Sequence, residues 1–252
     1  MDMQSRLALA AGSIGLAAML ALPTPALGQS EGPGFLFHQP TGSFTLRMGL
    51  SQPNATGDPY ADFSRDLTLS KSSYSAFDVA GDLAFRVTPK IDVVLSAGWA
   101  GSRARSELRH WLDENDLPIQ QTTTLERVPL TVSLRYYLRP RGQAVGRFAW
   151  VPLGLAPYVG AGGGLMYYRY HVWGNFVDLT DTIIYADNIG SEGWTGTAHV
   201  FAGVEVPVGP RFVLSGEARY ALAKGSLGSD FKDFGDINLS GFSVTVGVGV
   251  RF

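Results

Sequence analysis

Alternation with a period of two residues is the feature that most constrains this fold. Over residues 242–252 every even position is Val or Phe, and the odd positions between them are Ser, Thr, Gly or Arg. Successive side chains of a strand point to opposite faces, so this pattern predicts a strand with one apolar and one polar face. Seven further segments alternate similarly, although a glycine run at 160–164 blurs the fifth. They lie at 44–51, 77–87, 92–102, 127–136, 160–170, 197–206 and 212–222.

The lengths of the connections are a second, independent signal. Long polar stretches follow the odd strands, at 52–75, 103–124, 171–193 and 223–239. Even strands end mostly in tight turns, at 89–90 and 209–211, with a longer link at 139–156 as the exception. Membrane barrels show this pattern, with short periplasmic turns and long extracellular loops. The sequence therefore predicts an all-β fold: a closed antiparallel transmembrane β-barrel of eight strands, or ten if residues 171–193 add a hairpin.

The content of the two faces separates a membrane barrel from a soluble one. A soluble exterior is dense in Lys, Glu and Asp. Here the polar face is mostly Gly, Ala, Ser and Thr without Lys, and the apolar face carries no charge. A Lys or Arg at the lipid-facing midplane costs about 2–4 kcal/mol. We therefore expect the apolar face to contact lipid, with aromatic girdles at both rims. One girdle comprises Phe44, Phe85, Tyr136, Tyr158, Phe212 and Phe252, and the other Phe77, Trp99, Tyr168, Tyr170, Trp194 and Phe242.

The first residues resemble an export signal. Arg6 precedes an apolar stretch at 7–22, which prolines interrupt before the small residues Ala26 and Gly28. We expect a signal peptide at 1–28, a periplasmic lead-in at 29–41, the barrel at 42–252, and a location in the bacterial outer membrane. The net charge of −2 argues against nucleic acid as a partner. The chain has no cysteine, which excludes disulfides and thiolate chemistry.

Two segments resemble a known group. The closing strand 241–252 is similar to the terminal strand of bacterial outer-membrane proteins, and 157–164 resembles a strand opening of small OmpA-, OmpX- and OmpW-like barrels. The resemblance implies that Phe252, Val250 and Val248 act as the signal read by the barrel-assembly machinery. It also implies outer-membrane lipid and lipopolysaccharide as partners. It brings no catalytic motif and no peptidoglycan-binding domain.

Motifs for catalysis, cofactors or metals are not found. The glycine run lacks the Gly-Lys-Ser/Thr of a phosphate loop, and glycine relieving crowding in a strand is the better interpretation. None of the four histidines has a His or Cys neighbour at metal-ligand spacing. We therefore predict no enzyme, cofactor or metal. A surface-interaction scaffold is the first hypothesis, and a narrow channel for small or apolar solutes or a lipid-modifying enzyme are the alternatives.

Charges on the polar face predict how the lumen is filled. Their signs are mixed, and buried charges persist only when they are paired. We expect an ionic network across the barrel that plugs the lumen, with Arg251 also pointing inward. Its predicted members are Arg47, Asp78, Asp82, Arg86, Arg135, Arg169, Glu205, Glu217 and Arg219.

Overall fold

The computed structural model describes residues 34–57, 60, 65–112, 116–177, 183–228, 231 and 235–252. The predicted signal peptide and the first part of the lead-in lie outside them. Within the described chain, no helix is long and apolar enough to cross a bilayer.

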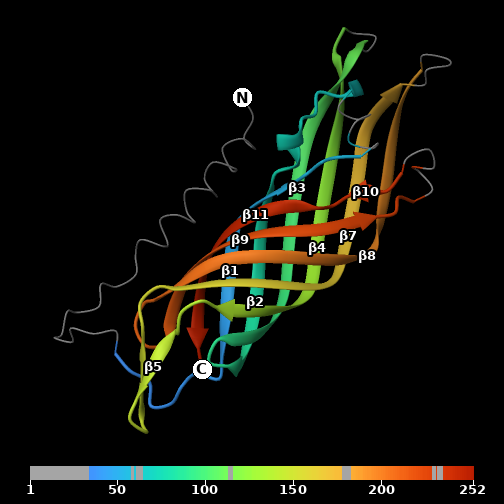
Figure 1. Ribbon diagram of the computed structural model, residues 1–252. Coiled ribbons are helices and arrows are strands. Elements are labelled where there is room, and N and C mark those ends of the chain that lie inside the picture. Colours follow the sequence, from blue (N-terminus) through green and yellow to red (C-terminus); the bar gives the residue numbers. More distant parts are fainter. Residues whose placement is uncertain are drawn as a thin grey trace. The chain divides into compact units, whose positions relative to one another are not determined.

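Eight antiparallel strands form one closed ring (Figure 1). Ring closure is made by the first and last strands, where Phe44 lies opposite Val250 and Leu50 opposite Val244. The predicted eight-stranded antiparallel barrel is confirmed. In ring order the strands are β1 (Gly42–Pro53), β2 (Ala76–Thr88), β3 (Ile91–Leu112), β4 (Pro118–Tyr137), β7 (Ala156–Val177), β8 (Ile184–Pro207), β9 (Phe212–Gly225) and β11 (Gly241–Arg251).

Four neighbouring strands are much longer than the other four. β3, β4, β7 and β8 have 20 to 24 residues, whereas β1, β2, β9 and β11 have 11 to 14. About 9–11 residues of a tilted strand cross a bilayer, so the long strands continue as a four-stranded sheet beyond the ring, which we call the extension (Figure 1). Residues 103–112 and 171–177, expected as loop, are strand. The segment 171–193 lengthens β7 and β8 and adds no strand pair to the ring, so the ten-strand alternative is wrong.

The opposite end, which we call the turn end, carries the short connections. Its long link holds a two-stranded hairpin, β5 (Gly142–Val145) and β6 (Ala149–Pro152). Leu36 of the lead-in exchanges backbone hydrogen bonds with Trp150 of β6, at 2.8 and 2.7 Å. At the extension end, a 3-10 turn, η1 (Lys71–Tyr74), and the short β10 (Ile237–Asn238) complete the described elements.

Side chains alternate between lumen and exterior as predicted on seven strands, but the assignment for β7 was wrong. Tyr158, Tyr168 and Tyr170 were expected in the girdles, yet they are at most 2% exposed and point inward. On this strand the inner face carries Tyr158, Tyr168 and Tyr170 together with Gly160, whereas Tyr167 lies outside with Arg169. A Cβ on Gly160 would lie 2.2 Å from Cζ of Phe201, so the missing side chain makes room for a ring. The assumption that the polar face is the inner face therefore fails here.

Candidate functional site: the filled lumen

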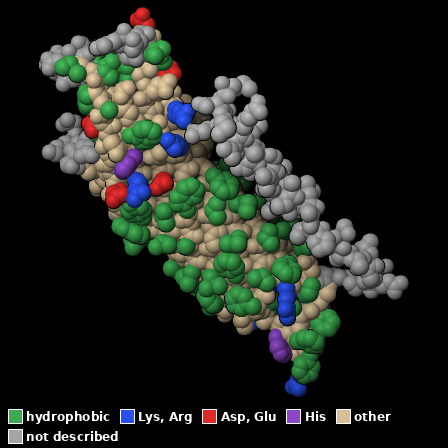
Figure 2. Space-filling model, turned by 180° about the vertical axis from the view of Figure 1, so that it is seen from behind, with side chains coloured by type: hydrophobic (Ala, Val, Ile, Leu, Met, Phe, Trp, Pro, Cys, Tyr) green, Lys and Arg blue, Asp and Glu red, His purple; other side chains and the backbone are tan. Residues whose placement is uncertain are grey.

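Exposed apolar side chains are spread over the exterior of the ring, as the face in Figure 2 illustrates. Leu50, Leu134, Val200 and Val246 are each 58–68% exposed. In water, such a surface would be far larger than the apolar patches of soluble monomers. Aromatic side chains flank it, with Phe85 and Phe212 toward the turn end and Trp99 and Trp194 toward the extension. This arrangement is that of a lipid-contacting surface.

Charged side chains inside the ring meet at mid-height. The Arg47 guanidinium binds both carboxylate oxygens of Asp82, with Nε–Oδ2 at 2.8 Å and Nη2–Oδ1 at 3.0 Å. Arg135 lies between three acids, at 3.4 Å from Asp82, 3.3 Å from Glu205 and 3.8 Å from Glu217. All five side chains are at most 5% exposed. Mutual pairing is what allows these charges to remain ionised in the lumen.

Two further arginines complete this network. Arg219 binds Glu217 at 2.9 Å, and Arg251 binds Glu205 at 3.3 Å. Neutral donors satisfy the remaining acceptor positions, since Ser96 donates to Asp82 at 2.7 Å and the Tyr137 hydroxyl to Glu205 at 2.6 Å. The luminal network, as we call it, consists of Arg47, Asp82, Arg135, Glu205, Glu217, Arg219 and Arg251.

Three residues predicted for this network lie outside it. Arg169 is on the exterior of β7, where it binds Glu192 at 2.9 Å and Glu126 at 3.7 Å. Its placement in the lumen was wrong because the faces of β7 are reversed relative to the prediction. Asp78 and Arg86 do point inward, but neither makes a direct ion pair within the described part of the chain.

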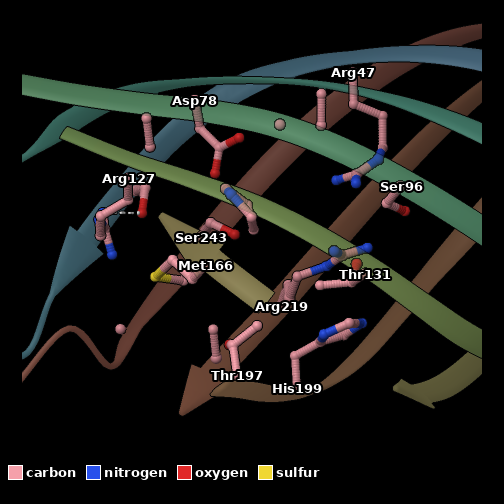
Figure 3. Close-up of a pocket in the computed structure, with 17 residues that line it drawn as sticks. Arg47, Asp78, Ser96, Arg127, Thr131, Met166, Thr197, His199, Arg219 and Ser243 are labelled. Atoms are coloured by element: carbon pink, nitrogen blue, oxygen red, sulfur yellow. Dashed lines mark hydrogen bonds between the residues drawn. The ribbon is translucent and has the colours of Figure 1, made fainter. Parts of the chain in front are cut away.

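Asp78 faces a chamber of about 60 Å³ on the extension side of the network (Figure 3). Arg127 lines the same chamber; its Nη2 donates to Ser51 at 2.8 Å and its Nη1 to the Leu239 carbonyl at 3.3 Å. Roughly 10–15 Å³ of such space holds one water, so the chamber has room for about four. We expect these waters to bridge Asp78 and Arg127, because a buried charge needs a polar partner.

Packed side chains lie beyond the chamber at the extension end. Tyr60, Tyr74 and Tyr170 form an aromatic group there, with the Tyr60 and Tyr74 ring centroids 5.0 Å apart. Burial raises the pKa of Tyr60 and of Tyr74, so both hydroxyls are neutral. These tyrosines belong to one buried cluster, which we call the cap. Its members are Ala55, Tyr60, Leu67, Leu69, Tyr74, Leu125, Met166, Tyr168, Tyr170, Val172, Ala223, Phe231, Ile237 and Leu239.

The floor at the turn end is equally occupied. Trp150 is 4% exposed, and the Arg251 guanidinium lies 5.6 Å from the centroid of its ring. Beside it, Arg141 binds both oxygens of Asp92 at 2.7 Å and lies 4.1 Å from the Tyr137 ring centroid. From the turn end to the extension, the lumen therefore holds the floor, the network, the chamber and the cap in succession.

One pair resembles the start of a catalytic arrangement. Ser133 Oγ lies 2.8 Å from His199 Nε2, the spacing of a nucleophile and its general base. Both side chains are buried between the network and the chamber, and the chamber is far smaller than a lipid acyl chain. Across the described ranges, no group of three His, Asp or Glu residues is placed to hold a metal. The geometry is that of a satisfied luminal hydrogen bond.

Sequence reasoning missed several luminal partners. The ion pair between Asp92 and Arg141 was not predicted. Arg141 lies in the link, directly before the β5–β6 hairpin, and the alternation of the strands says nothing about which acid a residue of the link will reach. Tyr137 and Tyr158 were not expected to donate to Glu205 and Glu217, which they do at 2.6 and 3.0 Å. Arg127 was not among the predicted luminal charges, although it has the same parity as Arg135 in the alternating segment 127–136, and that parity was the signal for a luminal role.

The closed ring, the apolar exterior and the polar filled interior define a membrane-spanning β-barrel. No family model and no curated protein matches the chain. Solved structures do match. Neisserial surface protein A (NspA) aligns over 84% of this chain and 96% of its own, with 13% identity and a TM-score of 0.45. The outer membrane protein OprG from Pseudomonas aeruginosa aligns over 88% and 99%, with 15% identity and a TM-score of 0.43. Ail from Yersinia pestis aligns over 84% and 99%, with 14% identity and a TM-score of 0.40.

Proposed function

We propose that this chain is an outer-membrane barrel that acts as a surface-interaction scaffold with a plugged lumen. The observation that carries the proposal is the luminal network. Its seven side chains come from β1, β2, β4, β8, β9 and β11, six of the eight strands of the ring. Side chains from opposite walls therefore meet at the centre. An eight-stranded ring is just wide enough for its side chains to fill.

The extension supports the surface-interaction part of the proposal. In this assignment the turn end faces the periplasm and the extension faces outward, as in other membrane barrels. β8 pairs with β9 only from Thr197 onward, so residues 184–189 border the extension with an edge that no named strand covers. Such an edge offers backbone groups to an added strand. On the outer face Arg103 lies 5.4 Å from the Trp173 ring centroid, a polar and aromatic surface suited to lipopolysaccharide or a partner.

Assembly follows from the same proposal. The chain would be exported by residues 1–28, and Phe252, Val250 and Val248 would engage the barrel-assembly machinery. In β11, Val248 and Val250 face outward and are 48% and 36% exposed. Export is tested by the N-terminal sequence of the mature protein, which we expect to begin at Gln29. Assembly is tested by Phe252→Ala, which we expect to reduce the amount of folded barrel in the membrane.

Planar-bilayer conductance of the refolded barrel tests the plugged lumen. We expect silence in the wild type and in Arg105→Ala, a control at an exposed position outside the ring. Arg135→Ala removes the side chain that touches three acids, so we expect leak currents in that variant. Steady currents in the wild type would refute the plugged lumen and favour the narrow channel.

Enzymatic activity is the other alternative, and we propose that there is none. Incubation of the refolded barrel with radiolabelled phospholipid and lipopolysaccharide should give no product. Turnover that disappears in both Ser133→Ala and His199→Ala would overturn this proposal and would make the buried pair catalytic.

A further inference from the structure

A second pocket lies at the turn end, between the lead-in and the floor. It has a volume of about 40 Å³. Four segments far apart in the sequence supply its walls: the lead-in, the β2–β3 turn with the end of β2, the link with its hairpin, and the end of β11. The lining residues are Gln39, Pro40, Arg86, Pro89, Pro140, Arg141, Gly142, Trp150 and Arg251.

The chemistry of this lining favours an anion. Its three charged residues, Arg86, Arg141 and Arg251, are all cationic, and none of the nine is acidic. Arg141 is already bound to Asp92, and the Nη2 atom of Arg251 to Glu205. The Nη1 atoms of Arg86 and Arg251 are different, because both are buried without a hydrogen-bond partner among the described residues.

An unpartnered guanidinium nitrogen in a buried position is costly. Arg251 is only 4% exposed, and a donor left unsatisfied at such a place loses the full free energy of its hydration, more when it is charged. Arg86 adds a cation that no carboxylate of the described chain neutralises directly. An anion in the pocket would satisfy both nitrogens with charge-assisted hydrogen bonds.

The distribution of charge at the turn end also favours an anion. The turn-end segments 34–44, 84–93, 134–158, 204–214 and 248–252 contain only two acidic residues, Asp92 and Glu205, and both are internal and already bound to arginines. A concave site surrounded by lysines and arginines, with few acids between them, raises the local concentration of anions. The basic residues of these segments are Arg86, Lys90, Arg135, Arg139, Arg141, Arg147, Arg211 and Arg251.

The pocket is also preorganised. Pro40, Pro89 and Pro140 come from three separate segments and have fixed φ angles. Trp150 closes one side, held by its backbone pairing with Leu36. A rigid site loses little conformational entropy on binding.

We propose that this pocket binds a phosphate group, free or on a lipid head group, with Arg86 and Arg251 as its principal donors. Guanidinium forks approaching from different strands suit an anion with several oxygens, and arginine is the usual residue for such recognition. The site does not depend on whether the lumen conducts, and it would mark the periplasmic mouth as a binding surface in its own right.

Calorimetric titration of the refolded barrel with inorganic phosphate, in phosphate-free maltoside micelles, tests the site. We expect saturable binding at one site. Arg86→Gln should raise the dissociation constant about tenfold, the effect of one lost hydrogen bond between charged groups. Arg147→Gln is the matched control, since it removes the same charge from the same end without lining the pocket, and its dissociation constant should change less than twofold. Folding of each variant is checked by its heat-modifiable migration on a gel.

Reconstitution into phosphatidylglycerol nanodiscs separates the two sources of the phosphate. If the lipid supplies it, inorganic phosphate should bind at least tenfold more weakly in the nanodiscs than in micelles, and Arg86→Gln should abolish a shifted lipid resonance in phosphorus NMR. Equal affinity in both media would assign the site to free phosphate. The proposal is overturned if the wild type shows no saturable binding in micelles and no shifted lipid resonance in the nanodiscs. An equal increase of the dissociation constant in Arg86→Gln and Arg147→Gln would also overturn the proposal, because general electrostatic attraction to this end of the barrel would then explain the binding of phosphate.

Discussion

Asp82→Ala is the sharpest test of the luminal network. The Asp82 carboxylate accepts two hydrogen bonds from Arg47, at 2.8 and 3.0 Å, one from Ser96 at 2.7 Å and one from Arg135 at 3.4 Å. Its side chain is 1% exposed. Removing one partner of a buried ion pair costs about 3–5 kcal/mol, because the other charge is left without compensation. Arg47 and Arg135 each keep another acid within 4 Å, so neither is left wholly without compensation. We therefore expect Asp82→Ala to lower the free energy of unfolding by about 4 kcal/mol, the middle of that range.

Charge balance predicts a smaller effect for Arg135→Ala. The network holds four arginines and three acids, and without Arg135 each acid retains one arginine. Asp82 keeps Arg47, Glu205 keeps Arg251, and Glu217 keeps Arg219. We therefore expect Arg135→Ala to cost about 2 kcal/mol, half the loss in Asp82→Ala. The double variant again has one arginine more than it has acids, and it should be no less stable than Asp82→Ala alone.

Urea unfolding of the barrel in lipid vesicles, followed by tryptophan fluorescence, measures these differences as shifts in midpoint at constant slope. Arg105→Ala, at an exposed position of the extension, is the control and should stay within about 0.5 kcal/mol of the wild type. A loss below about 1 kcal/mol for Asp82→Ala would mean that water already screens these charges. A double variant whose loss is the sum of the two single losses would show that the residues do not interact.

Three further outcomes follow from the packing. Gly160→Ala should cost about 1–3 kcal/mol in the same titration, since its Cβ would overlap Phe201, whereas the open position Gly196→Ala should be neutral. Trp150→Ala should speed trypsin cleavage within the β5–β6 hairpin while the barrel stays folded on a gel, because the hairpin loses its buried anchor. Arg169→Ala should leave the urea midpoint unchanged, because its ion pairs are exposed on the exterior; a large loss would return this residue to the lumen.

The ring was predictable where the two faces differ in chemistry. β1 and β11 alternate between Val, Leu, Met or Phe outside and Ser, Thr, Gly or Arg inside, and lipid contact enforces that contrast. The extension was missed because it lies beyond the lipid. There, Arg103 and Arg105 alternate with Ala104 and Ser106, and neither face needs to be apolar. The polar alternation was therefore interpreted as loop.

The partners inside the lumen were less predictable than the inward direction of the side chains. Inward positions follow from parity alone, which placed Arg47, Asp82 and Glu217 correctly on the inner face. Which of them meet depends on strand tilt and on the stagger of the ring, and neither property is local in sequence. β7 shows the limit of parity itself. Gly160 makes space for the Phe201 ring of β8, and the inner face of β7 carries its own Tyr158, Tyr168 and Tyr170.

The distribution of charge along the lumen connects the two proposals. At mid-height, arginines and acids alternate closely enough that each charge has a partner, and we propose that this nearly balanced cross-section is a barrier to ions as well as a structural contact. Toward the turn end the acids are fewer than the arginines: Asp92 binds Arg141, whereas Arg86 has no carboxylate partner within the described chain. A surplus of buried cations costs stability unless a ligand provides the missing negative charge. The layer that we propose to close the barrel and the layer that we propose to bind phosphate thus differ in their supply of acidic residues.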